Sequence, residues 1–200
     1  MGIDIALIDL WIPILVSAIA CFVASSIIWM ALPHHKADIQ ALPDEDAFNG
    51  AVGGLGLKPG LYMFPNCQGT EGHKSEAFQA RWKAGPWGTI NVLGAQPSFG
   101  KNLAITFVEM LLISVIVAYL ASTAMEDNAG GRDIARFMFT GAFLGYVLGG
   151  FSVDAFLGKP TRFVITGVFD SLVYAAVTAV VFVFLWPEAA DIAAQLPVAP

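Results

Sequence analysis

Four long apolar stretches constrain what this chain can fold into more than any other feature of its sequence. They cover residues 10–32, 103–123, 137–153 and 163–186, and the third is close to the shortest length that spans a bilayer. A helix rises about 1.5 Å per residue, so about 20 apolar residues cross about 30 Å of hydrocarbon. Lipid offers no partner to an unpaired amide, so each stretch is expected to be helical. We therefore predict an all-α membrane protein, a four-helix transmembrane bundle forming one membrane domain over residues 1–200.

Composition agrees with a membrane location and excludes several classes of function. Apolar residues make up 56% of the chain and charged residues 13%, and the net charge is −6. A chain so poor in cations lacks the basic face that nucleic acid requires, so the expected partner is the lipid bilayer. The sequence has no Ser-His-Asp order, phosphate-binding loop or His-Glu-x-x-His run. We therefore expect no cofactor, and catalysis is not favoured.

The positions of Lys and Arg predict the orientation of the bundle. Cations close to the ends of spans are retained in the cytoplasm. Six lie between the first and second spans, two between the third and fourth, and two between the second and third. We expect both termini outside the cell and the long first loop, residues 33–102, in the cytoplasm. The N-terminus lacks the basic region of a signal peptide, so the first span is expected to be retained.

The segment 33–102 is too long for a simple connection, and it predicts a small mixed α/β cap between spans 1 and 2. Helix-start signals occur at Pro43, which precedes three acidic residues, and at Ser75, a good N-cap. Residues 61–65 and 89–93 are expected to pair as two short strands. So few elements bury little core, so the cap is expected to lean on the membrane surface or on a partner.

Three runs in and before the cap carry a resemblance to a known family. They are Ser26–Asp38 (SIIWMALPHHKAD), Leu42–Asp46 (LPDED) and Pro59–Pro65 (PGLYMFP). Together they resemble a family of bacterial four-span inner-membrane proteins of similar length, and the resemblance covers the whole chain. It implies the four-span layout and an inner-membrane location, and it implies no activity. Trp29 stands where members of that family often have His.

Two carboxylates lie inside predicted spans, Glu109 in the second and Asp170 in the fourth. A carboxylate at mid-membrane costs about 2.5 to 3.5 kcal/mol on insertion scales, so it rarely faces lipid. Both lie at similar depth from the same face, and Asp170 begins a polar row that includes Tyr174. One hypothesis is a buried pair that shares a proton or binds a cation. The alternative is that each acid is separately paired, Asp170 with the Tyr174 hydroxyl or with Arg162, and only fixes helix packing.

A second group of candidate ligands follows the first span directly. His34, His35 and Asp38 suit a transition metal, and His34 and Asp38 would share a face if an α-helix continued through them. His73 or Cys67 could complete the set from elsewhere in the cap. The alternative is that the two histidines only mark the lipid boundary.

Rows of small residues at intervals of four predict close helix packing in two spans. The rows are Gly141, Gly145 and Gly149 in the third span and Ser17, Cys21 and Ser25 in the first. The partner of each row is either another span of this chain or a second copy.

Three hypotheses for function follow. The leading one is a non-catalytic subunit or scaffold of a membrane complex, with other membrane subunits or a homo-oligomer as partners. The second is a small proton- or cation-coupled transporter using Glu109 and Asp170, which the absence of an internal repeat disfavours. The third is a metal-dependent membrane enzyme built on the histidines that follow the first span.

Overall fold

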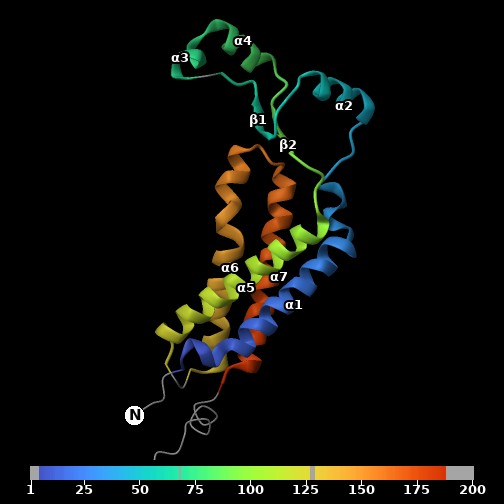
Figure 1. Ribbon diagram of the computed structural model, residues 1–200. Coiled ribbons are helices and arrows are strands. Elements are labelled where there is room, and N and C mark those ends of the chain that lie inside the picture. The colour runs from blue at the N-terminus through green and yellow to red at the C-terminus, as the bar shows by residue number, and fades with distance from the viewer. Residues whose placement is uncertain (1–4, 68, 127–128, 188–200) are drawn as a thin grey trace, which may run out of the picture.

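A computed structural model describes residues 5–67, 69–126 and 129–187 and shows four long helices with a small cap at one end (Figure 1). Each helix is long and apolar enough to cross a membrane, so the predicted four-span bundle is confirmed. The helices are α1 (Trp11–Met30, preceded by the 3-10 turn η1, Leu7–Leu10), α5 (Phe99–Ala124), α6 (Gly131–Phe156) and α7 (Thr161–Leu185).

Helix α6 is longer than the third apolar stretch of the sequence. It has 26 residues and begins at Gly131, six residues before the predicted start of the span. Its first two turns contain Arg132, Asp133 and Arg136, which a hydropathy criterion excludes from a span. A helix can carry such residues at its ends because long charged side chains reach the headgroup level there.

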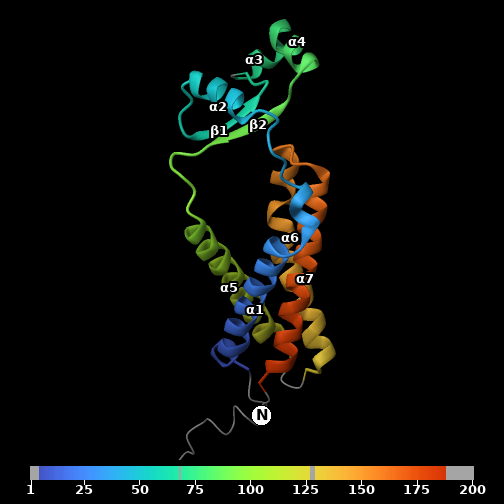
Figure 2. The ribbon, with the colours of Figure 1, turned by 90° about the vertical axis from the view of Figure 1, so that its right-hand side faces the viewer.

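The four helices follow the order α1, α5, α6, α7 around the bundle. Helix α1 packs against α5 and α7, and α6 packs against the same two helices. Figure 2 shows α5 diverging from α6 and α7 as it approaches the cap. The larger of two buried apolar clusters lies in the half of the bundle next to η1, which we call the terminal-side half, as opposed to the cap-side half. Its 0% exposed members include Leu10, Ala118, Ala121, Met138, Ala142 and Phe182.

The glycine row of α6 faces α5 along part of its length. A Cβ atom on Gly141 would lie 3.0 Å from Val117 Cγ1, and one on Gly145 would lie 3.1 Å from Ile113 Cγ2. A Cβ on Gly149 would have no neighbour within 4 Å. The row therefore allows close approach within this chain at its first two positions, and the helices have separated by the third.

The small-residue row of α1 faces α7. Cys21 is fully buried, and its thiol donates to the Tyr174 carbonyl at 3.4 Å and lies 3.4 Å from Thr178 Oγ1. Ser17 is buried beside it, and Ser25, one turn closer to the cap, is half-buried. This packing joins the first and last spans of the chain.

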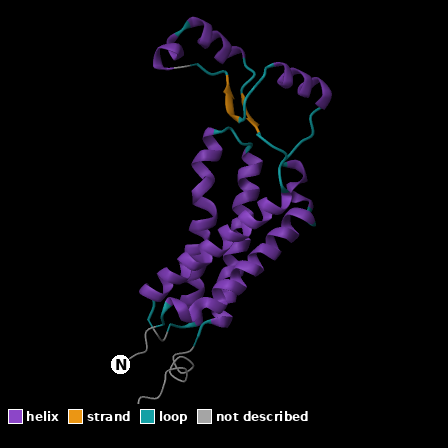
Figure 3. Ribbon diagram, viewed as in Figure 1, coloured by secondary structure: helices purple, strands orange, loops and turns teal. Residues whose placement is uncertain are grey.

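The cap is a two-stranded sheet with three short helices (Figure 3). The strands are antiparallel, from Gly60 opposite Val92 to Phe64 opposite Gly88, which confirms the predicted pairing. Phe78 is the only apolar side chain of the described cap that is buried. The elements are α2 (Glu45–Gly54), β1 (Gly60–Phe64), α3 (Gly69–Lys74), α4 (Glu76–Ala84) and β2 (Gly88–Val92).

Candidate metal-binding site

The site begins where α1 stops. Leu32 is extended, with φ −87° and ψ 143°, because the ring of Pro33 disfavours helical backbone at the residue before it. The chain then forms a short 3-10 helix, η2 (Pro33–Ala37). Residues three apart share a face in a 3-10 helix, so His35 Nδ1 lies 2.8 Å from Asp38 Oδ2. A continued α-helix would have placed His34 beside Asp38 instead, so the change of pitch decides which histidine the carboxylate holds.

The first turns of α7 fix η2 through a row of polar residues four apart. Thr166 Oγ1 donates to Asp38 Oδ2 at 2.7 Å. Arg162 Nε lies 3.0 Å from Asp38 Oδ1, and Arg162 Nη2 donates to the His34 carbonyl at 2.6 Å. The third member of the row, Asp170, points at the two imidazoles.

Asp170 is the centre of the site. Its Oδ2 lies 2.8 Å from His35 Nε2, and its Oδ1 lies 3.2 Å from His34 Nε2. The side chains of Asp170 and His35 are 5% and 6% exposed, and that of His34 is 25% exposed. One donor atom from each of the three residues lies within 4.8 Å of the other two. Two nitrogens and a carboxylate therefore converge on one small volume, which is open on the His34 side.

Aromatic rings hold both imidazoles. The Trp29 ring stacks on His35, with 3.8 Å between centroids and 6° between planes. Phe169 meets His34 edge to face at 5.9 Å. These contacts restrict the rotation of the rings and so help to aim their Nε2 atoms at Asp170.

The hydrogen bonds of the site require an additional positive charge. A neutral imidazole has one N–H, yet both nitrogens of His35 lie 2.8 Å from a carboxylate oxygen. Asp38 and Asp170 bring two negative charges near a single arginine, Arg162. The hydrogen bond from Thr166, together with that from His35 and the charge of Arg162, holds the pKa of Asp38 below its usual range. A proton on His35 or a metal ion beside Asp170 would supply the missing charge.

The donor set fits a transition-metal dication. Imidazole nitrogens and a carboxylate oxygen bind Zn²⁺ at about 2.0–2.2 Å, so neighbouring donors in a tetrahedral site are roughly 3.3 Å apart. The separations of 2.8 and 3.2 Å are close to that value. Metal-bound histidines commonly donate their other N–H to a carboxylate, and Asp38 occupies that position on His35.

The structure does not bring Glu109 and Asp170 together. Glu109 is exposed on α5 and makes no hydrogen bond or ion pair with any residue that the structure describes. Asp170 is paired with the histidines and not with Tyr174 or Arg162. The Tyr174 ring is buried and packs edge to face on Tyr146, with 5.4 Å between centroids.

The two cap residues considered as further ligands lie outside this cluster. His73 packs its ring on Phe78 with 4.9 Å between centroids, and Cys67 is half-buried with a free thiol. The sequence predicts His34, His35 and Asp38 as one candidate group and Asp170 as part of another, and it predicts no role for Thr166. The four-residue spacing of Arg162, Thr166 and Asp170 was the signal that would have joined them.

A comparison with known protein families, curated proteins and solved structures finds no match. Function is therefore argued from the geometry of the site.

Proposed function

We propose that this protein is a membrane metalloprotein that binds one divalent transition-metal ion, with Zn²⁺ the best fit, through His34, His35 and Asp170. The observation that carries the proposal is the convergence of two Nε2 atoms on one buried carboxylate, with Asp38 on the far nitrogen of His35. Mg²⁺ and Ca²⁺ prefer all-oxygen sites, so the two imidazoles favour the transition metals.

The coordination shell leaves room for another ligand. Three protein donors are typical of zinc sites that keep a fourth position for water or a substrate. His34 forms the exposed side of the cluster, so an ion and its fourth ligand would enter past His34. A fourth position of this kind is what a metal-dependent reaction at the site would use.

The test is metal binding by the full-length protein in detergent, with Cys67→Ser as background because a free thiol also binds zinc. Titration of Zn²⁺ against a chromophoric chelator should give one equivalent. His35→Gln and Asp170→Asn should each weaken binding by at least about tenfold, because each removes a ligand. His73→Gln is the matched control and should leave the affinity unchanged, because His73 lies outside the cluster.

Two results would overturn the proposal. One is a protein that binds no zinc while it remains folded by circular dichroism. The other is a loss in His73→Gln as large as that in His35→Gln. In either case the cluster is a proton-bearing network that joins α1 to α7.

A second candidate function is a subunit of a membrane complex, and the surface of the cap favours it. Leu61 and Trp87 are 57% and 61% exposed, and Phe78 alone forms the buried core of the described cap. Such surface is typical of a docking site. Mass measurement of the particle in gentle detergent should then show a fixed stoichiometry with a second subunit or a second copy. Trp87→Ala should release that partner, and a monomer in the parent protein would contradict this candidate.

We also propose that the cap is cytoplasmic and that both termini are outside, in the inner membrane. Eight of the ten Lys and Arg residues lie in the cap segment and the α6–α7 loop with its flanks. These two regions lie at the same end of the bundle (Figure 1). A cysteine replacing the exposed Lys83, in a background without Cys21 and Cys67, should react with an impermeant thiol reagent only after lysis. Reaction in intact cells would reverse the orientation.

A further inference from the structure

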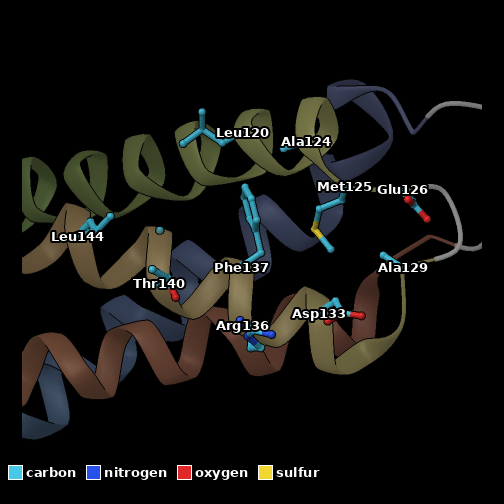
Figure 4. A pocket seen from close by; sticks show the side chains of 11 residues that line it. Leu120, Ala124, Met125, Glu126, Ala129, Asp133, Arg136, Phe137, Thr140 and Leu144 are labelled. Atoms are coloured by element: carbon cyan, nitrogen blue, oxygen red, sulfur yellow. The ribbon is translucent and has the colours of Figure 1, made fainter.

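A groove between α5 and α6 lies in the terminal-side half, at the opposite end of the bundle from the metal-binding site. Its volume is about 720 Å³, within the range of about 300–1,000 Å³ typical of pockets for small ligands. Figure 4 shows Phe137 and Met125 between the two helices, with Leu120 and Leu144 farther from the loop. The walls of the groove are therefore mostly apolar.

Charged side chains lie toward the loop end of the groove. Arg136, Asp133 and Glu126 line it there, and all three are exposed. Arg136 makes no ion pair with any residue in the described part of the chain. One cation and two carboxylates thus stand together without being paired with one another.

The order of these groups along α6 matches the order of groups in a phospholipid. Leu144 lies eight residues beyond Arg136, or about 12 Å deeper along the helix. Arg136 is close to the α5–α6 loop, where a cation reaches the headgroup level, and the apolar wall extends from there into the bilayer. A phosphate at Arg136 would therefore place an acyl chain along Phe137 and Leu144.

We propose that this groove is a binding site for phosphatidylethanolamine. Arg136 takes the phosphate, Asp133 and Glu126 take the ammonium, and an acyl chain fills the apolar part. The headgroup is selected by charge, because phosphatidylglycerol has the same phosphate but a neutral glycerol in place of the ammonium, and would leave both carboxylates without a cation. A zwitterionic headgroup satisfies both signs.

The test is lipid titration by native mass spectrometry on the delipidated full-length protein, with phosphatidylethanolamine and phosphatidylglycerol of identical chains. Phosphatidylethanolamine should bind more tightly. Arg136→Gln should weaken its binding about tenfold, the loss expected for one charge-assisted hydrogen bond. Arg132→Gln is the matched control, one turn earlier on α6 and outside the groove, and should have no effect. Asp133→Asn should reduce the preference between the two lipids, because it removes one of the two carboxylates that take the ammonium.

Ala124→Phe gives an independent check, because Ala124 is exposed in the groove and its enlargement fills the groove without entering the core. This variant should lose phosphatidylethanolamine binding and keep its melting temperature in detergent. Equal affinity of the parent protein for both lipids would overturn the proposal. So would equal losses in the Arg136 and Arg132 variants, because such losses would report a general attraction of lipid to surface cations.

Discussion

The two halves of the four-helix bundle are built from the same helices but differ in what fills the space between them. In the terminal-side half, alanines and Met138 let α5, α6 and α7 pack closely, and the buried Ser114 hydroxyl donates to the Ile14 carbonyl at 3.2 Å. In the cap-side half, α5 has moved away from α6, and buried polar residues lie between α1, η2 and α7. The difference teaches that close apolar packing fixes the fold at one end, while paired charges hold the candidate site at the other.

The strongest test of this contrast is a pair of substitutions in one glycine row. Gly141→Leu should destabilise the bundle by about 3 kcal/mol, because even the first added atom, Cβ, would lie only 3.0 Å from Val117 Cγ1. Gly149→Leu should change stability by less than about 0.5 kcal/mol, because nothing lies within 4 Å. Equilibrium unfolding in mixed micelles measures both. Equal losses would mean that α5 and α6 stay in contact along their whole length.

The next largest effect concerns zinc, which should stabilise one half only. At a free concentration 100 times the Kd, zinc should add about 2.7 kcal/mol of stability, and Asp170→Asn should abolish that gain. Hydrogen exchange should slow in η2 and the first turns of α7, and should be unchanged near Met138. Uniform slowing throughout the bundle would show that the halves are not independent.

Asp38→Asn sharpens the comparison within the cap-side half. Loss of a carboxylate behind a metal-bound histidine typically lowers metal affinity 10- to 100-fold, or about 1.4 to 2.7 kcal/mol. Asp154→Asn is the control, because Asp154 belongs to a separate ion pair with Lys159, at 2.8 Å. Chelator competition compares the two variants, and similar losses would assign the effect to general charge at this end of the bundle.

The smallest effect is expected from the aromatic ring on His35. Trp29→Leu removes a stacking contact worth about 0.5–1.5 kcal/mol and should weaken zinc binding by less than about tenfold. Trp11→Leu, an exposed tryptophan at the other end of α1, should leave zinc binding unchanged. If Trp29→Leu binds zinc as tightly as the parent protein, the stacking does not orient the ring.

The sequence predicted the elements that depend on local signals. Apolar length indicates the four helices, the side chains of Asp44 and Ser75 cap α2 and α4, and Gly85, with φ 70°, ends α4. Each of these features depends only on residues close together in the sequence, which is why the sequence alone predicts it.

The candidate site could be predicted only in part. The ligand types near His34 and at Asp170 were visible, but their union depends on α1 and α7 being neighbours, with about 135 residues between His35 and Asp170. Similar depth in the membrane suggested Glu109 as the partner of Asp170, but depth does not determine which face of a helix a residue occupies. Asp38 contacts His35 and not the predicted His34, because the chain after Pro33 forms a 3-10 helix in which residues three apart share a face.

Asp38 belongs to the polar cluster, and it directly precedes the connecting segment, residues 39–44, that leads to the cap. Binding events at the two places are therefore thermodynamically linked if a partner of the cap distinguishes docked from undocked Asp38. By reciprocity, such a partner would change the affinity of the site for its ion by the same factor by which the ion changes the affinity of the cap for that partner. Binding of an ion at the membrane boundary would then change the affinity of the cap for its partner in the aqueous phase, through the short segment 39–44.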